Sequence, residues 1–153
     1  CVVGSGYVGL VAGACFSSTG NDVTVVDINV QRVEALNRGE VPIFEPGLEG
    51  LVARNAEKGR LHFTTDLAAA CKGVDVIIIA VGTPSLPSGG VNLAYLDAAA
   101  AQIGEVIEDY TVVVTKSTVP VGSGERVSKI IRSVTDVLLL RVSLPPSFVS
   151  RIT

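Results

Sequence analysis

Short, continuously apolar runs alternate along the chain with longer stretches of helical spacing. The apolar runs predict strands buried on both faces, because strands with one solvent-facing side alternate apolar and polar residues. These runs cover Cys1–Val3, Val23–Val26, Leu61–Thr64, Val74–Ile79, Thr111–Val114 and Val137–Leu140. The helical stretches cover Tyr7–Thr19, Val30–Asn37, Pro46–Lys58, Leu93–Ile107 and Ser123–Val134. This order predicts an α/β domain with a doubly wound, mostly parallel sheet.

Length, charge and composition are typical of one compact domain. The chain has 153 residues, of which 48% are hydrophobic, and a formal net charge of −3. Its basic residues are scattered, which argues against a nucleic-acid or anionic-membrane partner. No apolar run approaches the roughly 20 residues of a membrane span. We therefore expect one domain over residues 1–153, acting in the cytoplasm.

The cysteines and the single histidine suggest neither a metal site nor a disulfide framework. Cys1, Cys15 and Cys71 form no C-x-x-C pair and no cluster with His62. Cys15 lies among apolar residues of an expected helix, so we interpret it as a small core residue. His62 lies at the start of an expected strand, away from the carboxyl edge of the sheet, and is interpreted as structural.

A glycine motif, Gly4-Ser5-Gly6-Tyr7-Val8-Gly9, follows the first apolar run and opens the first helix. In a nucleotide-binding turn, Gly4 permits the tight turn, Gly6 lets a pyrophosphate approach the backbone, and Gly9 lets helix and strand pack closely. The helix N-terminus then offers N–H groups and a partial positive charge to the phosphates. The motif predicts a dinucleotide-binding turn of the Rossmann type.

An acid at the end of the second strand completes this fingerprint. Asp27 is placed to accept hydrogen bonds from the adenosine ribose hydroxyls and to repel a 2′-phosphate, which favours NAD over NADP. Arg32 is expected to flank the adenine and ribose, although a nearby Arg can also serve a 2′-phosphate. The alternative is a glycine-rich turn without a ligand, with Asp27 capping the helix that begins near Val30.

Six blocks in one order resemble the UDP-glucose and GDP-mannose dehydrogenases, which oxidise a sugar-nucleotide alcohol twice to the acid. The resemblance runs from residue 1 to about residue 134. Its blocks begin with the glycine motif and continue with Val33–Gly39, Pro42–Leu48, Gly59–Asp66, Ala80–Pro84 and Thr115–Gly122.

The resemblance implies roles for particular residues. The cofactor NAD would contact Gly4, Gly6, Tyr7, Val8, Gly9, Asp27, Arg32, Thr83 and Thr118. Thr118 would also act in catalysis, near the nicotinamide, by holding a water. Both threonines follow buried apolar runs, so they are expected at the carboxyl edge of the sheet, where α/β folds bind ligands. Alternatively, Thr83 ends a strand and Thr118 turns the chain before Pro120.

The resemblance fails after residue 134. Ser147 and Arg151 stand where the family has two active-site glutamates, and a shifted reading frame is one hypothesis for this tail. The chain also contains no Met and begins within an apolar run, so we interpret it as a fragment. By comparison with the family, we expect this fragment to lack the central helix, the sugar-binding domain and the catalytic cysteine.

We therefore expect the NAD-binding part of a UDP-glucose 6-dehydrogenase-like enzyme. Its substrate would be a UDP-sugar, and the full-length enzyme would be a homodimer. A GDP-mannose or UDP-N-acetylaminosugar dehydrogenase, or a non-catalytic NAD-binding module, remains an alternative. On its own the chain is expected to bind NAD without turnover.

Overall fold

The computed structural model describes residues 1–135 and 139–143, and within them six strands form one sheet in the order β3-β2-β1-β4-β5-β6. Every neighbouring pair of strands is parallel. The strands are β1 (Val2–Val3), β2 (Val23–Val26), β3 (Leu61–Thr64), β4 (Val76–Ile79), β5 (Thr111–Thr115) and β6 (Leu139–Ser143). The predicted doubly wound sheet is confirmed, with strand order reversing between β1 and β4.

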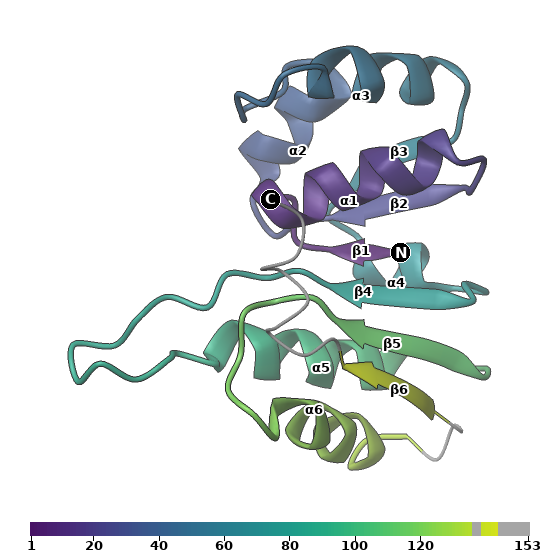
Figure 1. Ribbon diagram of the computed structural model, residues 1–153. Coiled ribbons are helices and arrows are strands. Elements are labelled where there is room, and N and C mark those ends of the chain that lie inside the picture. Colours follow the sequence, from purple (N-terminus) through teal and green to yellow (C-terminus); the bar gives the residue numbers. More distant parts are fainter. Residues whose placement is uncertain (136–138, 144–153) are drawn as a thin grey trace.

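Helices cover the sheet (Figure 1). They are α1 (Tyr7–Ser18), α2 (Val30–Asn37), α3 (Leu48–Glu57), α4 (Leu67–Cys71), α5 (Ala94–Val106) and α6 (Ser123–Arg132). The five expected helices are present. The helix expected at Pro46–Lys58 begins only at Leu48, because the preceding residue, Gly47, has a left-handed backbone conformation with φ of 82°. The short helix α4 was not predicted, and it begins where the Asp66 carboxylate accepts a hydrogen bond from the Ala69 N–H at 3.0 Å.

The expected strands are present, with small shifts at their ends. The strand expected at Val74–Ile79 begins at Val76. Residues 137–138 of the last expected strand, and the tail with Ser147 and Arg151, lie outside the described residues. Within the described ranges, no helix is both long and apolar enough to cross a bilayer. Nor do the described His, Cys, Asp and Glu residues include a group of three that could hold a metal ion.

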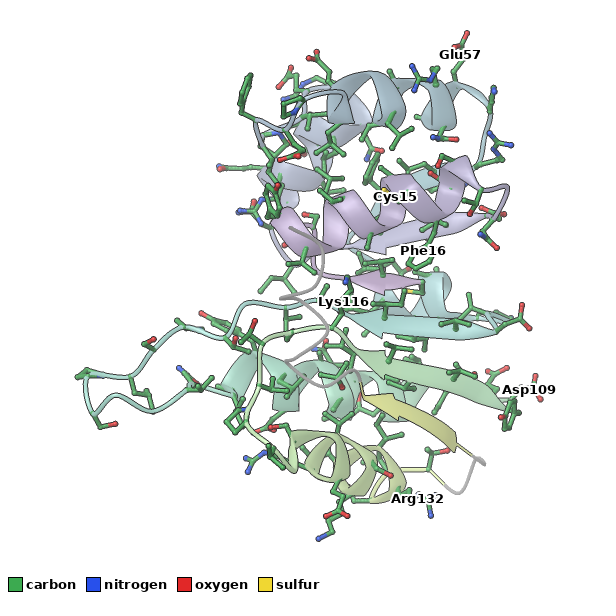
Figure 2. The ribbon with its side chains drawn as sticks, in the orientation of Figure 1. Cys15, Phe16, Glu57, Asp109, Lys116 and Arg132 are labelled. Carbon is green, nitrogen blue, oxygen red and sulfur yellow. The ribbon has the colours of Figure 1, made fainter. Side chains whose placement is uncertain are left out.

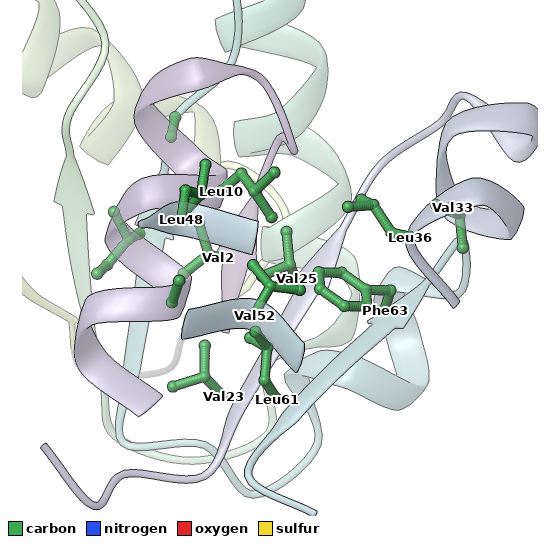
Figure 3. Packing of buried hydrophobic residues seen from close by; sticks show 13 residues of the cluster. Val2, Leu10, Val23, Val25, Val33, Leu36, Leu48, Val52, Leu61 and Phe63 are labelled. Atoms are coloured by element: carbon green, nitrogen blue, oxygen red, sulfur yellow. The ribbon is translucent and has the colours of Figure 1, made fainter. Parts of the chain in front are cut away.

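Successive residues of the central strands point into two different cores. Val2 of β1 belongs to the core beneath α1 and α3, which also contains Leu10 and Val52 (Figure 3). Val3 belongs to the core beneath α5 and α6, with Ile103 and other residues. This two-sided burial explains why the strands read as unbroken apolar runs.

The prediction that Cys15 is a small core residue is wrong. Its side chain is exposed, whereas Leu10, Gly13, Ala14 and Ser17 form the buried face of α1. Since α1 is apolar nearly all round, its residue spacing does not reveal which face meets the sheet.

Candidate dinucleotide site

The first functional element is the turn between β1 and α1, where the carboxyl ends of the strands meet (Figure 1). Gly4 has φ of 105°, and its N–H donates to the Val26 carbonyl at 2.7 Å. A Cβ on Gly4 would lie 2.6 Å from the Ala80 carbonyl oxygen. Both the left-handed backbone and the neighbouring strand therefore require glycine at this position.

Gly9 and Gly6 meet very different surroundings. A Cβ on Gly9 would lie 1.8 Å from the Gly4 carbonyl oxygen, so the close contact of α1 with the turn excludes any side chain. At Gly6 a Cβ would have nothing within 4 Å, and the backbone φ of −67° suits any residue. Folding therefore explains Gly4 and Gly9 but not Gly6. The space above Gly6 lies at the N-terminus of α1, which favours an anion.

Asp27, which follows β2, lies beside this turn in a dense hydrogen-bond network. Its Oδ2 accepts from the Ser5 N–H at 2.8 Å and from the Ser5 hydroxyl at 2.6 Å, and Arg32 Nη1 lies 3.4 Å away. Its Oδ1 accepts from the Asn29 N–H at 2.9 Å. With its donors concentrated on Oδ2, the carboxylate keeps most of its remaining acceptor capacity on Oδ1.

The charge of Asp27 is stabilised by these donors. Burial of the carboxyl raises its pKa, but the hydrogen bonds from Ser5 and Asn29, together with the nearby Arg32, outweigh burial and lower the pKa. Asp27 therefore carries a negative charge at neutral pH. A fixed negative charge at this point favours ribose hydroxyls and opposes a phosphate.

A groove of about 770 Å³ runs along the glycine turn and Asp27. Its lining includes Gly4, Gly6, Asp27 and Arg32, so the structure brings together four of the predicted cofactor residues. The lining also includes residues from the start of α4 and along α5, among them Leu67, Ala68, Tyr95, Gln102 and Glu105. Sequence reasoning missed these helix residues, because nothing in their spacing distinguishes a groove wall from a solvent-facing surface.

Tyr7 and Val8 lie at the start of α1, outside the lining of this groove, and both are exposed. The Tyr7 hydroxyl donates to the Glu45 carboxylate in the loop before α3. This hydrogen bond raises the pKa of the Tyr7 hydroxyl, with smaller effects of desolvation and of the Glu45 charge. This hydrogen bond links the loop between α2 and α3 to the N-terminus of α1.

Thr83 and Thr118 follow β4 and β5 and lie together at the carboxyl edge of the sheet. The Thr83 hydroxyl donates to the Thr118 carbonyl at 2.8 Å, and the Ser117 hydroxyl donates to the Val81 carbonyl at 2.7 Å. These two bonds join the chain segments that leave the strands. Neither threonine lines the groove, whereas Gly82 does. Lys116, which follows β5 directly, is exposed at the same edge (Figure 2).

The long loop between β4 and α5 forms a projecting hairpin (Figure 1). Ser85 and Val91 pair as an antiparallel bridge, and the Leu86 N–H donates to the Gly90 carbonyl at 2.7 Å. Of this loop, Ala80, Val81 and Gly82 line the groove, and the hairpin itself does not.

His62 lies at the opposite, amino-terminal edge of the sheet. Its Nε2 is 3.1 Å from the Gly59 carbonyl and 3.3 Å from an Asp22 carboxylate oxygen. These contacts agree with its interpretation as a structural residue.

Ser5 is the clearest residue that the sequence reasoning missed. It is 1% exposed and directs two donors to one oxygen of Asp27. Its place as the second residue of the glycine motif was the available signal, since that residue faces the end of the neighbouring strand.

We expect Ser5→Ala to cost about 1.5–3 kcal/mol of unfolding free energy, because a hydrogen bond to a partly buried, charged carboxylate is lost. The preference for NADH over NADPH should also fall, since the carboxylate is less firmly placed. Urea unfolding and calorimetry measure the two effects. Ser17→Ala is the matched control: Ser17 is also buried, but its hydroxyl donates to a neutral carbonyl, that of Ala14, at 2.9 Å. Equal destabilisation in both variants, with an unchanged cofactor preference, would contradict this role.

A doubly wound parallel sheet with this glycine turn, open helix N-terminus and strand-end acid defines the class of Rossmann-type dinucleotide-binding domains. Residues 1–150 match the model of the UDP-glucose/GDP-mannose dehydrogenase family, NAD binding domain. The chain belongs to this family of oxidoreductases, as its NAD-binding domain. The match extends beyond residue 134, where the resemblance of the sequence blocks ends.

Individual relatives agree with this assignment. The chain is 49% identical over 148 residues to UDP-glucose 6-dehydrogenase from Rhizobium meliloti, covering 96% of the chain and 34% of that protein. It superposes on a UDP-glucose dehydrogenase from Pyrobaculum islandicum with a TM-score of 0.89 and 38% identity, covering 93% of the chain and 34% of that structure. For the GDP-mannose dehydrogenase of Pseudomonas aeruginosa, solved as a ternary complex, the TM-score is 0.86 at 34% identity, with coverage of 93% and 35%. The chain thus spans about a third of these relatives.

Proposed function

We propose that this chain holds NAD for the oxidation of a nucleotide sugar, with UDP-glucose as the substrate. The observation that carries the cofactor site is the open space above Gly6, a glycine that neither backbone conformation nor packing requires. The diphosphate would occupy this space at the N-terminus of α1. The adenosine ribose would then reach Asp27, with Arg32 beside it.

NAD, when bound, accepts a hydride, and this chain's residues contribute placement and electrostatics. Thr83 and Ser117 hold the segments after β4 and β5 together through their bonds to the carbonyls of Thr118 and Val81. Thr118 itself is exposed, and no described residue is bonded to its hydroxyl. This hydroxyl is therefore free to hold a water or a sugar hydroxyl, which is the catalytic role we propose for Thr118.

The proposed overall reaction is the conversion of UDP-glucose to UDP-glucuronate with two molecules of NAD. The 49% identity to a UDP-glucose 6-dehydrogenase supports this substrate over the alternatives. The similarity to a GDP-mannose dehydrogenase structure favours the second candidate, GDP-mannose. We propose residues 1–153 as one NAD-binding domain, with the sugar-binding domain in a separate part of the enzyme. The homodimer of the full-length enzyme stays a prediction.

Binding and turnover test the two halves of this proposal separately. Calorimetry on the isolated chain should show NADH binding in preference to NADPH, and no NADH should form with UDP-glucose and NAD. The full-length enzyme should reduce NAD at least tenfold faster with UDP-glucose than with GDP-mannose. The opposite substrate preference would reject UDP-glucose and leave the cofactor site intact, whereas a folded chain without NADH affinity would reject the cofactor site.

A further inference from the structure

Two cysteines that are 70 positions apart in the sequence lie in contact. The Cys71 thiol donates to Cys1 Sγ, with the two sulfurs 3.9 Å apart. Cys1 directly precedes β1 and is partly exposed, and Cys71 is the last residue of α4 and is 3% exposed. The fold therefore forms a thiol pair that no spacing motif indicates.

The backbone around each thiol is held by regular structure. The Cys1 N–H group donates to the Val76 carbonyl, and the Cys1 carbonyl accepts from the Ile78 N–H, both at 2.8 Å. Cys71 is part of the buried core with Ile77 and Ile79, and Cys1 packs against that core. The proximity of the sulfurs thus follows from the pairing of β1 with β4 and the packing of α4.

The pair is reachable from one side. A groove of about 660 Å³ on the amino-terminal side of the sheet is lined by Cys1 together with Asn21, Asp22 and Lys72. Cys1 lines this groove, whereas Cys71 does not. Burial raises the pKa of the Cys71 thiol to about 11, so little of this thiol is ionised at neutral pH.

We propose that Cys1 and Cys71 are a thiol–disulfide exchange site that a low-molecular-weight disulfide oxidises to an intramolecular disulfide. In the first step the Cys1 thiolate attacks one sulfur of the reagent, the reagent's S–S bond breaks, and one thiolate leaves. In the second step Cys71 sulfur attacks Cys1 sulfur, and the second reagent thiolate leaves. The protein loses two electrons and two protons, and the reagent becomes two thiols.

The geometric change is small. A disulfide has an S–S distance of about 2.05 Å, so the two sulfurs must approach one another from 3.9 Å. The modification lies at the amino-terminal edge of the sheet, away from the glycine turn. It does not depend on the proposed substrate.

The test is a peptide map of the protein after incubation with glutathione disulfide. The protein is reduced, freed of reductant, exposed to the reagent, quenched with acid, and alkylated with N-ethylmaleimide under denaturing conditions. We expect the Cys1–Cys71 cross-linked peptide to exceed either cross-link to Cys15 by at least tenfold. In the same experiment in concentrated guanidinium chloride, where the fold is lost, this excess should disappear.

Exposed Cys15, on the outer side of α1, is the internal control (Figure 2). If Cys15 is glutathionylated while Cys1 and Cys71 are both still alkylated, the proposal is overturned. Cys71→Ala should stop the exchange at a Cys1–glutathione mixed disulfide, and Cys15→Ala should leave the cross-link unchanged. Should Cys71→Ala fail to fold, the map of the unsubstituted protein still decides the question.

Discussion

Replacing Asp27 by Asn should reduce the preference for NADH over NADPH by about 10–150-fold, equivalent to about 1.5–3 kcal/mol. The substitution removes the negative charge that opposes a 2′-phosphate, and it weakens the acceptor for the ribose hydroxyls. Arg32, 3.4 Å from the carboxylate, then becomes available to a 2′-phosphate. Calorimetric dissociation constants for both cofactors measure the change, and their ratio cancels any loss of folded protein.

Asp22→Asn is the matched control for this experiment. Asp22 has 80% of its side chain exposed and lies by His62 at the opposite edge of the sheet. Its removal should leave the NADH/NADPH ratio unchanged. Equal binding of NADPH and NADH by the unsubstituted protein would show that Asp27 does not select the cofactor.

The same substitution, Gly to Ala, should have opposite consequences at two neighbouring glycines. Gly9→Ala places a Cβ 1.8 Å from the Gly4 carbonyl oxygen, so the turn and α1 must separate. We expect a loss of about 3 kcal/mol of unfolding free energy, measured by urea denaturation. Gly6→Ala meets no atom within 4 Å and should change stability by less than about 1 kcal/mol.

For cofactor affinity, in contrast to stability, the substitution at Gly6 should have the large effect. Gly6→Ala fills the space proposed for the diphosphate, so NADH affinity should fall by at least about tenfold in a protein that is fully folded. Calorimetry on the Gly6→Ala variant measures this loss, and circular dichroism establishes that the fold is retained. Unchanged NADH affinity in this variant would place the diphosphate elsewhere and remove the main support for the cofactor site.

The architecture was predictable because it depends on local patterns. Unbroken apolar runs report burial on both faces, and helical spacing reports the crossovers between them, so the parallel sheet followed from chain order alone. The helix α4 escaped this reasoning because five residues are too few to show a period. Its start depends on a single cap, Asp66.

The candidate site was predictable where its residues form one contiguous motif. Gly4, Gly6 and Gly9 could be assigned distinct roles from their order, and the surroundings of Gly4 and Gly9 match the roles assigned to them. Asp27 could be placed at the end of its strand, beside the turn. The partners of these residues were not predictable, because the sequence carries no distance between Ser5 and Asp27, or between Tyr7 and Glu45.

By itself, then, the sequence determined the sheet, the glycine turn and the strand-end acid, since each is encoded within a few successive residues. Only the tertiary structure decided which groups surround them: the contact of Ser5 with Asp27, the part of α5 in the lining of the groove, and the contact of Cys1 with Cys71. The physical reason is that helices and strands pack through whole faces. Which side chains meet across those faces depends on the relative placement of elements far apart in the chain, and that placement is established only when the core forms.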